Sequence, residues 1–147
     1  MKKKVLAYIT RYHQGDLQLL VFKNLSDAAV GIQVPGGTVE ADEREEEALY
    51  REIEEESGLV HLRFLRKLDT YVHYQGSLRH SEERHVFHVE SLEQPTNRWT
   101  HVVDSFGDDD GQVYEYFWVP IPLAQGVLSR DQGRSLAFLH QQRRQAS

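Results

Sequence analysis

The sequence predicts an α+β fold in which a mixed central β-sheet is flanked by helices. Three observations carry this prediction: short β-rich segments make up most of the chain, a glutamate-rich segment of helix length interrupts them, and a helical pattern lies near the C-terminus. A length of 147 residues fits one domain, so we treat residues 1–147 as a single unit.

The N-terminal part of the chain predicts a sheet followed by a turn. Val5–Arg11 and Leu17–Lys23 are β-rich, and the connection His13–Asp16 contains the glycine and aspartate expected of a hairpin. Ile32–Val34 is a shorter extended piece. We expect Pro35–Gly37 to end it as a turn, because glycine adopts backbone geometries closed to other residues.

The acidic segment from Glu43 to Glu56 predicts a helix. Either Asp42 or Thr38 is placed to cap it, glutamates in its first turn suit the positive end of the helix dipole, and Gly58 ends it. Eight of its fourteen residues are glutamate and two are arginine, so this segment alone carries the formal net charge of −6. Closely spaced like charges destabilise a helix unless cations neutralise them, and a divalent metal is the obvious candidate.

The C-terminal half predicts three more strands and a second helix. Extended patterns cover Leu62–Tyr74, Arg84–Glu90 and Val113–Val119. The charged stretch Asp104–Gly111 predicts a solvated loop near the site, with a lid or a metal-binding role as the alternative. Apolar residues at helical spacing predict a C-terminal helix over Ser129–Gln145.

Composition excludes several classes of protein. The chain has no cysteine, which rules out disulfides, thiolate metal sites and a cysteine nucleophile. A pI near 5.7 without a basic patch argues against binding of a nucleic-acid duplex, whereas a single nucleotide stays open as a ligand. Every apolar run is shorter than the roughly 18 residues that span a bilayer, so we expect a cytoplasmic protein without membrane contact.

Three glutamates of the acidic helix can converge on one site. At about 100° per residue, Glu52 and Glu56 stand one turn apart and Glu55 lies about 60° to one side. Apolar residues flank this sector, so the three carboxylates border the buried face of the helix. Four other glutamates point largely the other way and are expected to face solvent: Glu43, Glu46, Glu47 and Glu54.

The convergent glutamates match the ligand preference of Mg²⁺. This cation takes oxygen ligands and commonly uses one or two carboxylates together with water and substrate phosphates. Structural cation sites tend to be closed, whereas carboxylates on one helix leave half of the coordination sphere open. The arrangement therefore favours chemistry on phosphates.

The spacing of the acidic segment resembles the Nudix box. All nine defined positions of that motif, which spans twenty-three residues, are filled: Gly37, Glu43, Arg51, Glu52, Ile53, Glu55, Glu56, Gly58 and Leu59. The resemblance is strong over Val34–Leu59, and elsewhere only the order of strands and helices agrees. It implies an α/β/α sandwich that uses Mg²⁺ or Mn²⁺ to hydrolyse a nucleoside diphosphate linked to another moiety.

The resemblance also implies roles for individual residues. The implied metal ligands are Glu52, Glu55, Glu56 and the main-chain carbonyl of Gly36. Arg51 is similar to the arginine that orients the box glutamates by ion pairing, and Glu43 is similar to its partner. Bound metals stabilise charge on pyrophosphate oxygens and make water more acidic, so a carboxylate near that water completes the site. Glu52 is the first candidate for this base.

A carboxylate outside the box is the alternative base, because a glutamate elsewhere takes this role in some relatives of the family. Glu115, on the last predicted strand, is the candidate for a base or an extra ligand. The competing interpretation is a strand carboxylate that points outward. Glu82 and Glu83 are weaker candidates from a loop.

Candidate substrate contacts lie outside the box. Arg11 and Lys23, on the opening hairpin, are candidates for phosphate contacts, although basic residues at strand ends are more often plain surface. Aromatic residues can stack on a base. Tyr74 lies sixteen residues after Gly58, a spacing that resembles diadenosine-polyphosphate hydrolases of the family.

The favoured function is a metal-dependent pyrophosphohydrolase that acts on a small-molecule nucleotide, such as a nucleoside triphosphate or a dinucleoside polyphosphate. One alternative is a Nudix-like module that binds a nucleotide without cleaving it, and another is an acidic helix used for protein interaction. Degenerate modules usually lose box glutamates, and none is lost here. The substrate, the bond cleaved, the number of metals and the choice between monomer and homodimer stay open.

Overall fold

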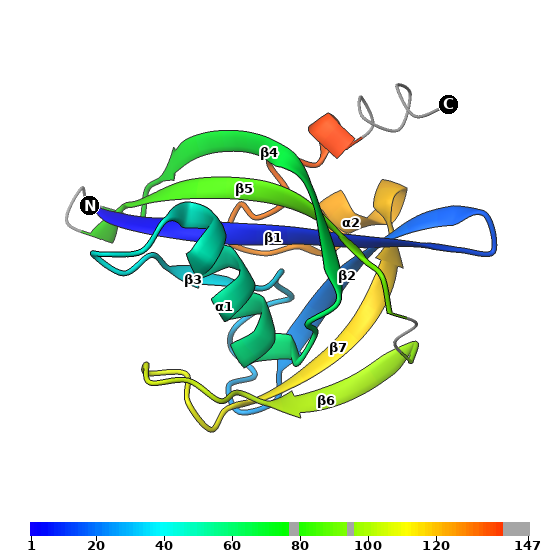
Figure 1. Cartoon of the computed structure of the whole chain (residues 1–147), viewed down its shortest axis with the longest axis horizontal. Coiled ribbons are helices and arrows are strands. Elements are labelled where there is room, and N and C mark those ends of the chain that lie inside the picture. The colour runs from blue at the N-terminus through cyan, green and yellow to red at the C-terminus, as the bar shows by residue number, and fades with distance from the viewer. Residues whose placement is uncertain (77–79, 94–95, 140–147) are drawn as a thin grey trace.

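The structure, a computed structural model, describes residues 1–76, 80–93 and 96–139. Figure 1 shows how its strands and helices are arranged. In chain order the elements are β1 (Lys2–His13), β2 (Asp16–Asn24), β3 (Gly36–Thr38), α1 (Glu45–Ser57), β4 (Leu62–His73), β5 (Glu82–Ser91), β6 (Arg98–Val102), β7 (Val113–Pro120) and α2 (Ile121–Val127). No helix in these described ranges is long and apolar enough to cross a membrane.

The sheet is mixed, as predicted. Its strands follow the order β4-β5-β1-β2-β7-β6, and β3 pairs with β1 off this path. β1 runs parallel to β5 and antiparallel to β2 and β3, and the remaining neighbours are antiparallel to one another. The central position of β1 explains why its middle residues are almost completely buried.

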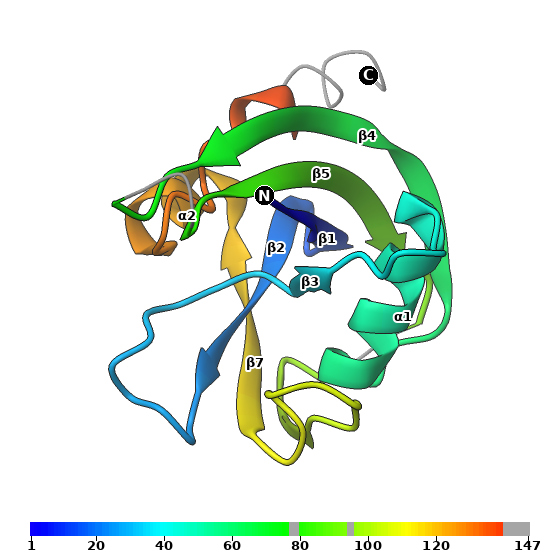
Figure 2. The same cartoon turned by 90° about the vertical axis from the view of Figure 1, so that its left-hand side faces the viewer.

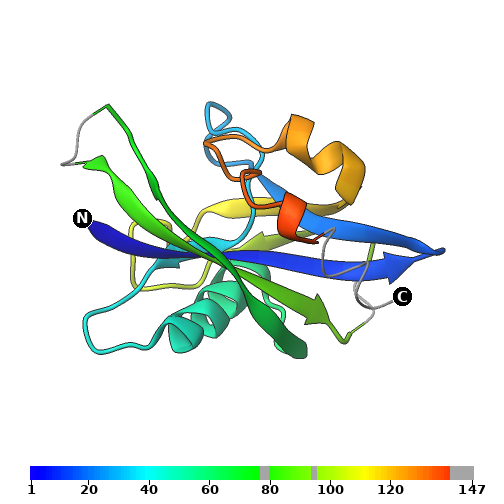
Figure 3. The same ribbon diagram turned by 90° about the horizontal axis from the view of Figure 1, so that it is seen from above.

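Helices cover both faces of this sheet, as Figure 3 shows for α1 on one side and α2 on the other. Val5, Ala7 and Ile9 of β1 pack in one core cluster with the apolar residues of α1. Leu6 and Tyr8 pack in a second cluster with α2 and the segment that follows it. Successive side chains of a strand point to opposite faces, so β1 supplies both layers of the predicted α/β/α sandwich.

The predicted hairpin turn and the predicted end of the acidic helix are both confirmed. His13 pairs with Asp16, and the two residues between them, Gln14 and Gly15, have positive φ angles of 52° and 85°. A two-residue turn with two positive φ angles matches the twist of a hairpin. Gly58 ends α1 with a φ of 80°, and its N–H donates to the carbonyl of Glu54 at 2.9 Å.

The predicted turn at Pro35–Gly37 is wrong, because Gly36 begins the short strand β3. Both glycines avoid the positive φ region, so conformational freedom is not why they are needed. A Cβ atom on Gly36 would instead lie 2.3 Å from the carbonyl oxygen of Val5. The glycine therefore allows β3 to approach β1 closely, and Figure 2 shows β3 between β1 and α1.

The start of α1 also differs from the prediction. The helix begins at Glu45, and its N-cap is Arg44 instead of Asp42 or Thr38. The carboxylate of Glu47 accepts a hydrogen bond from the Arg44 N–H at 3.0 Å, which satisfies one free donor of the first turn. An edge strand that the sequence did not indicate, β6, covers the alternating polar and apolar segment Arg98–Val102.

The predicted helix over Ser129–Gln145 is not found over residues 130–136, which form turns. Residues 137–139 are helical, and residues 140–147 lie outside the described ranges. A regular helix occurs earlier, at Ile121–Val127, with a proline in its first turn. Arg130 and Asp131 have positive φ angles of 55° and 63°, which no α-helix allows. Leu136 and Leu139, two of the apolar residues behind the helical pattern, are still buried in the second core cluster.

Candidate active site

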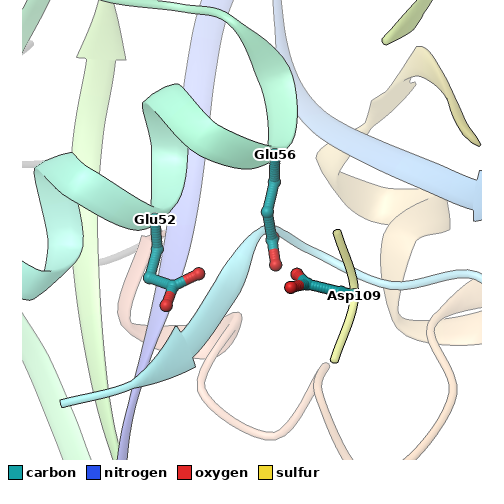
Figure 4. Close-up of side chains that lie close together, drawn as sticks. All are labelled: Glu52, Glu56 and Asp109. Atoms are coloured by element: carbon teal, nitrogen blue, oxygen red, sulfur yellow. The ribbon is translucent and has the colours of Figure 1, made fainter. Parts of the chain in front are cut away.

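Three carboxylates converge beside α1. Glu52 and Glu56 come from successive turns of the helix, and Asp109 comes from the loop between β6 and β7. Each offers a ligand oxygen, and these oxygens lie within 4.8 Å of one another. Figure 4 shows the Asp109 carboxylate facing that of Glu56, with Glu52 one turn away on the same side of the helix.

The helix places its two carboxylates at the edge of the core. Glu52 and Glu56 are four residues apart, so they share the side of α1 that also carries the fully buried Leu49 and Ile53. Their exposed fractions are only 8% and 5%. The two glutamates therefore meet at a site that is mostly shielded from bulk water.

The loop between β6 and β7 brings Asp109 to the helix. The N–H of Asp104 donates to the carbonyl of Glu55 at 3.2 Å, which ties the start of the loop to the last turns of α1. Ser105 Oγ donates to Asp109 Oδ1 at 2.7 Å. The expectation that this loop is merely solvated is therefore wrong for Asp109, and its acidic composition was the signal for the alternative.

Burial and nearby like charges raise the pKa values of the Glu52 and Glu56 carboxyls. Burial, together with the charge of Glu55, raises the pKa of Glu52 to about 7, although Arg51 opposes the shift. Burial, with the charges of Glu52 and Asp109, raises the pKa of Glu56 well above its ordinary value. Such groups are costly to ionise unless a cation joins them. An all-oxygen donor set of this kind fits a hard divalent cation such as Mg²⁺ or Mn²⁺.

Two glycines press against these carboxylates. The N–H of Gly36 donates to Glu56 Oε1 at 3.0 Å. A Cβ atom on Gly37 would lie 2.2–2.4 Å from the carboxylate atoms of Glu52. Gly37 therefore leaves room for Glu52 beside β3, whereas Gly36 holds Glu56 through its backbone N–H.

We expect Gly37→Ala and Gly36→Ala to fail in different ways. The alanine methyl at residue 37 meets the movable end of Glu52, so it should displace that carboxylate and lower kcat at least about tenfold while the fold survives. The methyl at residue 36 meets a backbone carbonyl of β1, so it should lower the free energy of unfolding by about 2–4 kcal/mol. Urea denaturation and steady-state kinetics on both variants test this contrast. Equal loss of stability in the two would contradict it.

Arg51 is the hub of the surrounding ion pairs. Its guanidinium donates to both carboxylate oxygens of Glu43, at 2.6 and 2.8 Å, and to the carbonyl of Thr38 at 3.0 Å. It also donates to Glu52 at 2.9 Å and to Glu55 at 3.2 Å. The hydrogen bond from Arg51 is the main reason that the pKa of Glu43 is lowered. Arg51 therefore fixes the carboxylates that flank the cluster.

For Glu43 and Glu55, the structure differs from what their directions on the helix predict. The direction of Glu43 on a helix predicted a solvent-facing side chain, but Glu43 precedes α1 and its side chain is only 15% exposed. It pairs with Arg51, as the Nudix resemblance implied. Glu55 lies on the border of the site and binds Arg51, whereas the carboxylate triad takes its third member from Asp109. A helical projection fails for Glu43 because the residue lies outside the helix.

Four other candidates lie away from the cluster. Glu115 of β7 forms ion pairs with Arg98 of β6 at 2.9 Å and with Lys23 of β2 at 3.8 Å. These ion pairs link neighbouring strands. Arg11 donates to Gln18 and Asn97 and lies over the ring of Trp118. Tyr74 is 64% exposed. None of Glu115, Lys23, Arg11 and Tyr74 lines the pockets described next.

Two adjoining pockets meet at β3. The carboxylate pocket, of about 790 Å³, contains Arg51 and the carboxylate triad and is bordered by Lys2, Lys4 and the fully exposed Phe106. The side pocket, of about 320 Å³, is lined by Phe22, Gln33, Arg84, Tyr114, Arg130 and Gln132. Lys4, Gly36, Gly37 and Glu56 line both. Lys2 and Lys4 were not among the candidates from the sequence, although their alternate positions on β1 place them on one face.

Comparison with known proteins supports the family indicated by this fold and pocket. The model of the NUDIX domain matches residues 2–143. The 8-oxo-dGTP diphosphatase of Haemophilus influenzae is 42% identical over 65 residues. That match spans 42% of this chain and 48% of the relative, about half of its length.

Solved structures share the fold. A C. elegans Ap4A hydrolase, in a binary complex, superimposes with a TM-score of 0.71 at 19% identity, covering 95% of this chain and 96% of that one. The NUDIX domain of Shewanella oneidensis NrtR, complexed with ADP ribose, gives 0.69 at 16% identity over 96% of this chain and 87% of that one. The architecture is thus that of the NUDIX class. The chain belongs to the NUDIX domain family.

Proposed function

We propose that this protein is a metal-dependent pyrophosphohydrolase that cleaves a phosphoanhydride bond of a nucleotide. The observation that carries the proposal is the convergence of Glu52, Glu56 and Asp109 in a pocket that also holds two lysines. Membership of the NUDIX family and similarity to a diphosphatase indicate a hydrolase that acts on phosphoanhydride bonds.

The proposed ligands of Mg²⁺ or Mn²⁺ are Glu52, Glu56 and Asp109, with Glu55 and the carbonyl of Gly36 at the border of the same pocket. When bound, such a cation supplies charge stabilisation at phosphate oxygens and a more acidic water. Lys2 and Lys4 place further positive charge on the rim, where they can attract the phosphates of a substrate.

Glu52 is the proposed general base. Its carboxylate lies within the cluster, next to the proposed metal and to the water that such a metal would hold. Arg51 orients Glu52 through a 2.9 Å hydrogen bond and is in turn held by Glu43. Arg51 and Glu43 therefore act as positioning residues in the proposal.

The proposed substrate is a small-molecule nucleotide whose phosphates occupy the carboxylate pocket and whose nucleoside occupies the side pocket. Relatives named for 8-oxo-dGTP, Ap4A and ADP ribose define the first substrates to test. In the side pocket Phe22 and Tyr114 stack on each other with ring centroids 4.2 Å apart, which gives one wall an aromatic character.

The test of the proposed function is a screen of nucleoside triphosphates, dinucleoside polyphosphates, ADP-ribose and nucleotide sugars with Mg²⁺ or Mn²⁺. We expect turnover of at least one class, abolished by a chelator and restored by the metal. Metal-independent turnover would contradict the proposal. Tight nucleotide binding without turnover would favour the alternative of a nucleotide-sensing module.

Asp109→Asn tests the loop ligand. The amide oxygen can still accept from Ser105, so we expect the loop to keep its shape while apparent metal affinity falls about 10- to 100-fold. Asp108→Asn is the matched control, because it removes the same charge from an exposed neighbour and should change metal affinity less than about threefold. Metal titrations followed by activity and by thermal melting measure both. Equal effects of the two substitutions would remove Asp109 from the site.

Three expectations stay predictions: one domain over residues 1–147, a cytoplasmic location, and a homodimer as the alternative to a monomer. Limited proteolysis would test the first, since cleavage within the sheet should require global unfolding. Cell fractionation and light scattering would test the other two.

A further inference from the structure

Three consecutive carbonyls at the edge of the side pocket are held by buried side chains. We call the segment the 130–132 turn. Arg84 Nη1 donates to its first carbonyl at 2.6 Å, Tyr71 Oη to its second at 3.0 Å, and Tyr8 Oη to its third. Arg84 and Tyr8 have exposed fractions of 2% and 0%. The three side chains come from three different strands, so the sheet itself fixes the turn.

The 130–132 turn has a backbone conformation that its residues do not favour by themselves. Arg130 and Asp131 have φ angles of 55° and 63°, in the left-handed region that residues with a side chain rarely adopt. Such a shape persists only where the surroundings impose it, and strained residues often cluster at ligand sites. Its consequence here is that Gln132 is carried, 5% exposed, to the wall of the side pocket.

The orientation of the Gln132 amide is fixed by chemistry. The backbone N–H of Val34 donates to Gln132 Oε1 at 2.8 Å. A flipped amide would place its NH₂ group against that N–H, donor against donor, so the oxygen must face Val34. No hydrogen bond in the described part of the chain uses Gln132 Nε2. The nitrogen is therefore left to donate to a ligand in the pocket.

Gln132 Nε2 is one of several N–H donors that line the side pocket. Lys4 and Arg130 also carry N–H groups. The acceptors of the lining include the side-chain oxygens of Gln33, Gln75, Glu56 and Glu82, and Arg84 binds Glu82 at 2.9 Å. A volume of about 320 Å³ suits one nucleobase with its sugar. At the position of Gln132 Nε2, a ligand group that accepts a hydrogen bond is favoured over one that donates.

We propose that Gln132 is a specificity-determining residue, whose Nε2 donates to the 6-carbonyl oxygen of a purine in the side pocket. A 6-amino group at the same place would oppose donor to donor. The protein should therefore prefer hypoxanthine- or guanine-type nucleotides over adenine nucleotides. The inference rests on the proposed function only in that a nucleotide is the ligand.

The test is equilibrium binding of inosine and adenosine monophosphates, which differ at the purine 6-position, measured by calorimetry at pH 8 without added metal. We expect the wild type to bind inosine monophosphate at least about tenfold more tightly, since an unpaired buried donor penalises the wrong ligand. In Gln132→Glu an oxygen still accepts from Val34 while the donor becomes an acceptor, so the preference should vanish or invert. Gln132→Met should also abolish it, without adding charge.

Gln75→Glu is the matched control. Gln75 lines the same pocket but is exposed, so its new charge should weaken both nucleotides alike and leave their ratio unchanged. A wild type without preference, a Gln132→Glu variant with the wild-type ratio, or binding of neither nucleotide would each overturn the inference. Because no hydrolysis is required, a hydrolase without this preference refutes only the role of Gln132, and a selective binder without turnover refutes only the proposed function.

Discussion

Glu56→Gln should lower kcat at least about 100-fold while leaving the protein folded. The glutamine oxygen can still accept from the Gly36 N–H, so the contact to β3 survives and only the charge is lost. Glu56 lies between Glu52 and Asp109 in the cluster, so its charge contributes to the site from the centre. Phosphate release with saturating Mg²⁺, on wild type and variant, measures the effect. Unchanged metal-dependent turnover would refute the site.

The same variant should gain stability when metal is absent. A carboxyl whose folded pKa is raised stabilises the fold at low pH, and this contribution is lost as pH rises through the folded pKa. For Glu56 the pKa is raised well above 4.5, so between pH 5 and 8 the metal-free wild type should lose stability relative to Glu56→Gln. We expect the variant to melt about 2–4 °C higher at pH 8 for each kcal/mol removed.

Added metal should reverse this order. Metal binding needs ionised carboxylates, so Mg²⁺ should raise the melting temperature of the wild type more at pH 8 than at pH 6. Glu56→Gln should show a much smaller rise, because one charged ligand is gone. Melting curves at both pH values, with and without Mg²⁺, check the sign. A larger metal effect at the lower pH would contradict the assignment of the carboxylates as ligands.

Arg51→Met should damage both stability and activity. The substitution keeps much of the side-chain stem but leaves the carboxylates of Glu43, Glu52 and Glu55 crowded without their shared cation. Removing one partner of a partly buried ion network leaves uncompensated charge, so we expect the free energy of unfolding to fall by about 2–4 kcal/mol. Because Glu52 loses its orientation, kcat should also fall about 10- to 100-fold. Urea denaturation and kinetics measure the two effects.

Two controls separate the reasons for this loss. Arg51→Lys keeps the charge but not the paired donors that hold Glu43, so it should recover stability only in part. Arg63→Met removes an arginine from a surface pair with Glu90, where the Arg63 side chain is 59% exposed, and should change stability by less than about 1 kcal/mol. Equal losses of stability in Arg51→Met and Arg63→Met would show that the ion pairs of Arg51 contribute no more than a surface ion pair.

Local patterns predicted most regular elements, because each pattern is decided by neighbouring residues. Alternating β-rich segments gave most of the strands, and the hairpin at Gln14 and Gly15 follows from its turn residues. The predicted C-terminal helix is wrong over residues 130–136 for a physical reason. Side chains from distant strands take the carbonyls of the 130–132 turn, and tertiary contacts override a weak local preference there.

In the candidate site too, local spacing predicts some residues and only the tertiary fold brings in the others. The spacing of Glu52 and Glu56 is a helical property, so the sequence alone places both on one face and, through the Nudix box, indicates the family that the match to residues 2–143 confirms. The third carboxylate is Asp109, whose loop lies more than fifty residues further along the chain. Only the packing of the β6–β7 loop against the end of α1 brings it there.

The sequence by itself determined the mixed sheet, the acidic helix and the family, because these depend on periodicity and on spacing within one short segment. The tertiary structure decided which carboxylates meet, why Gly36 and Gly37 must be glycine, and which polar group faces the side pocket. These depend on distances between segments that are remote in the chain. The candidates outside the box depended on such remote distances. Glu115, for example, was chosen because it is a glutamate on a predicted strand, but in the folded chain it forms ion pairs with Arg98 and Lys23.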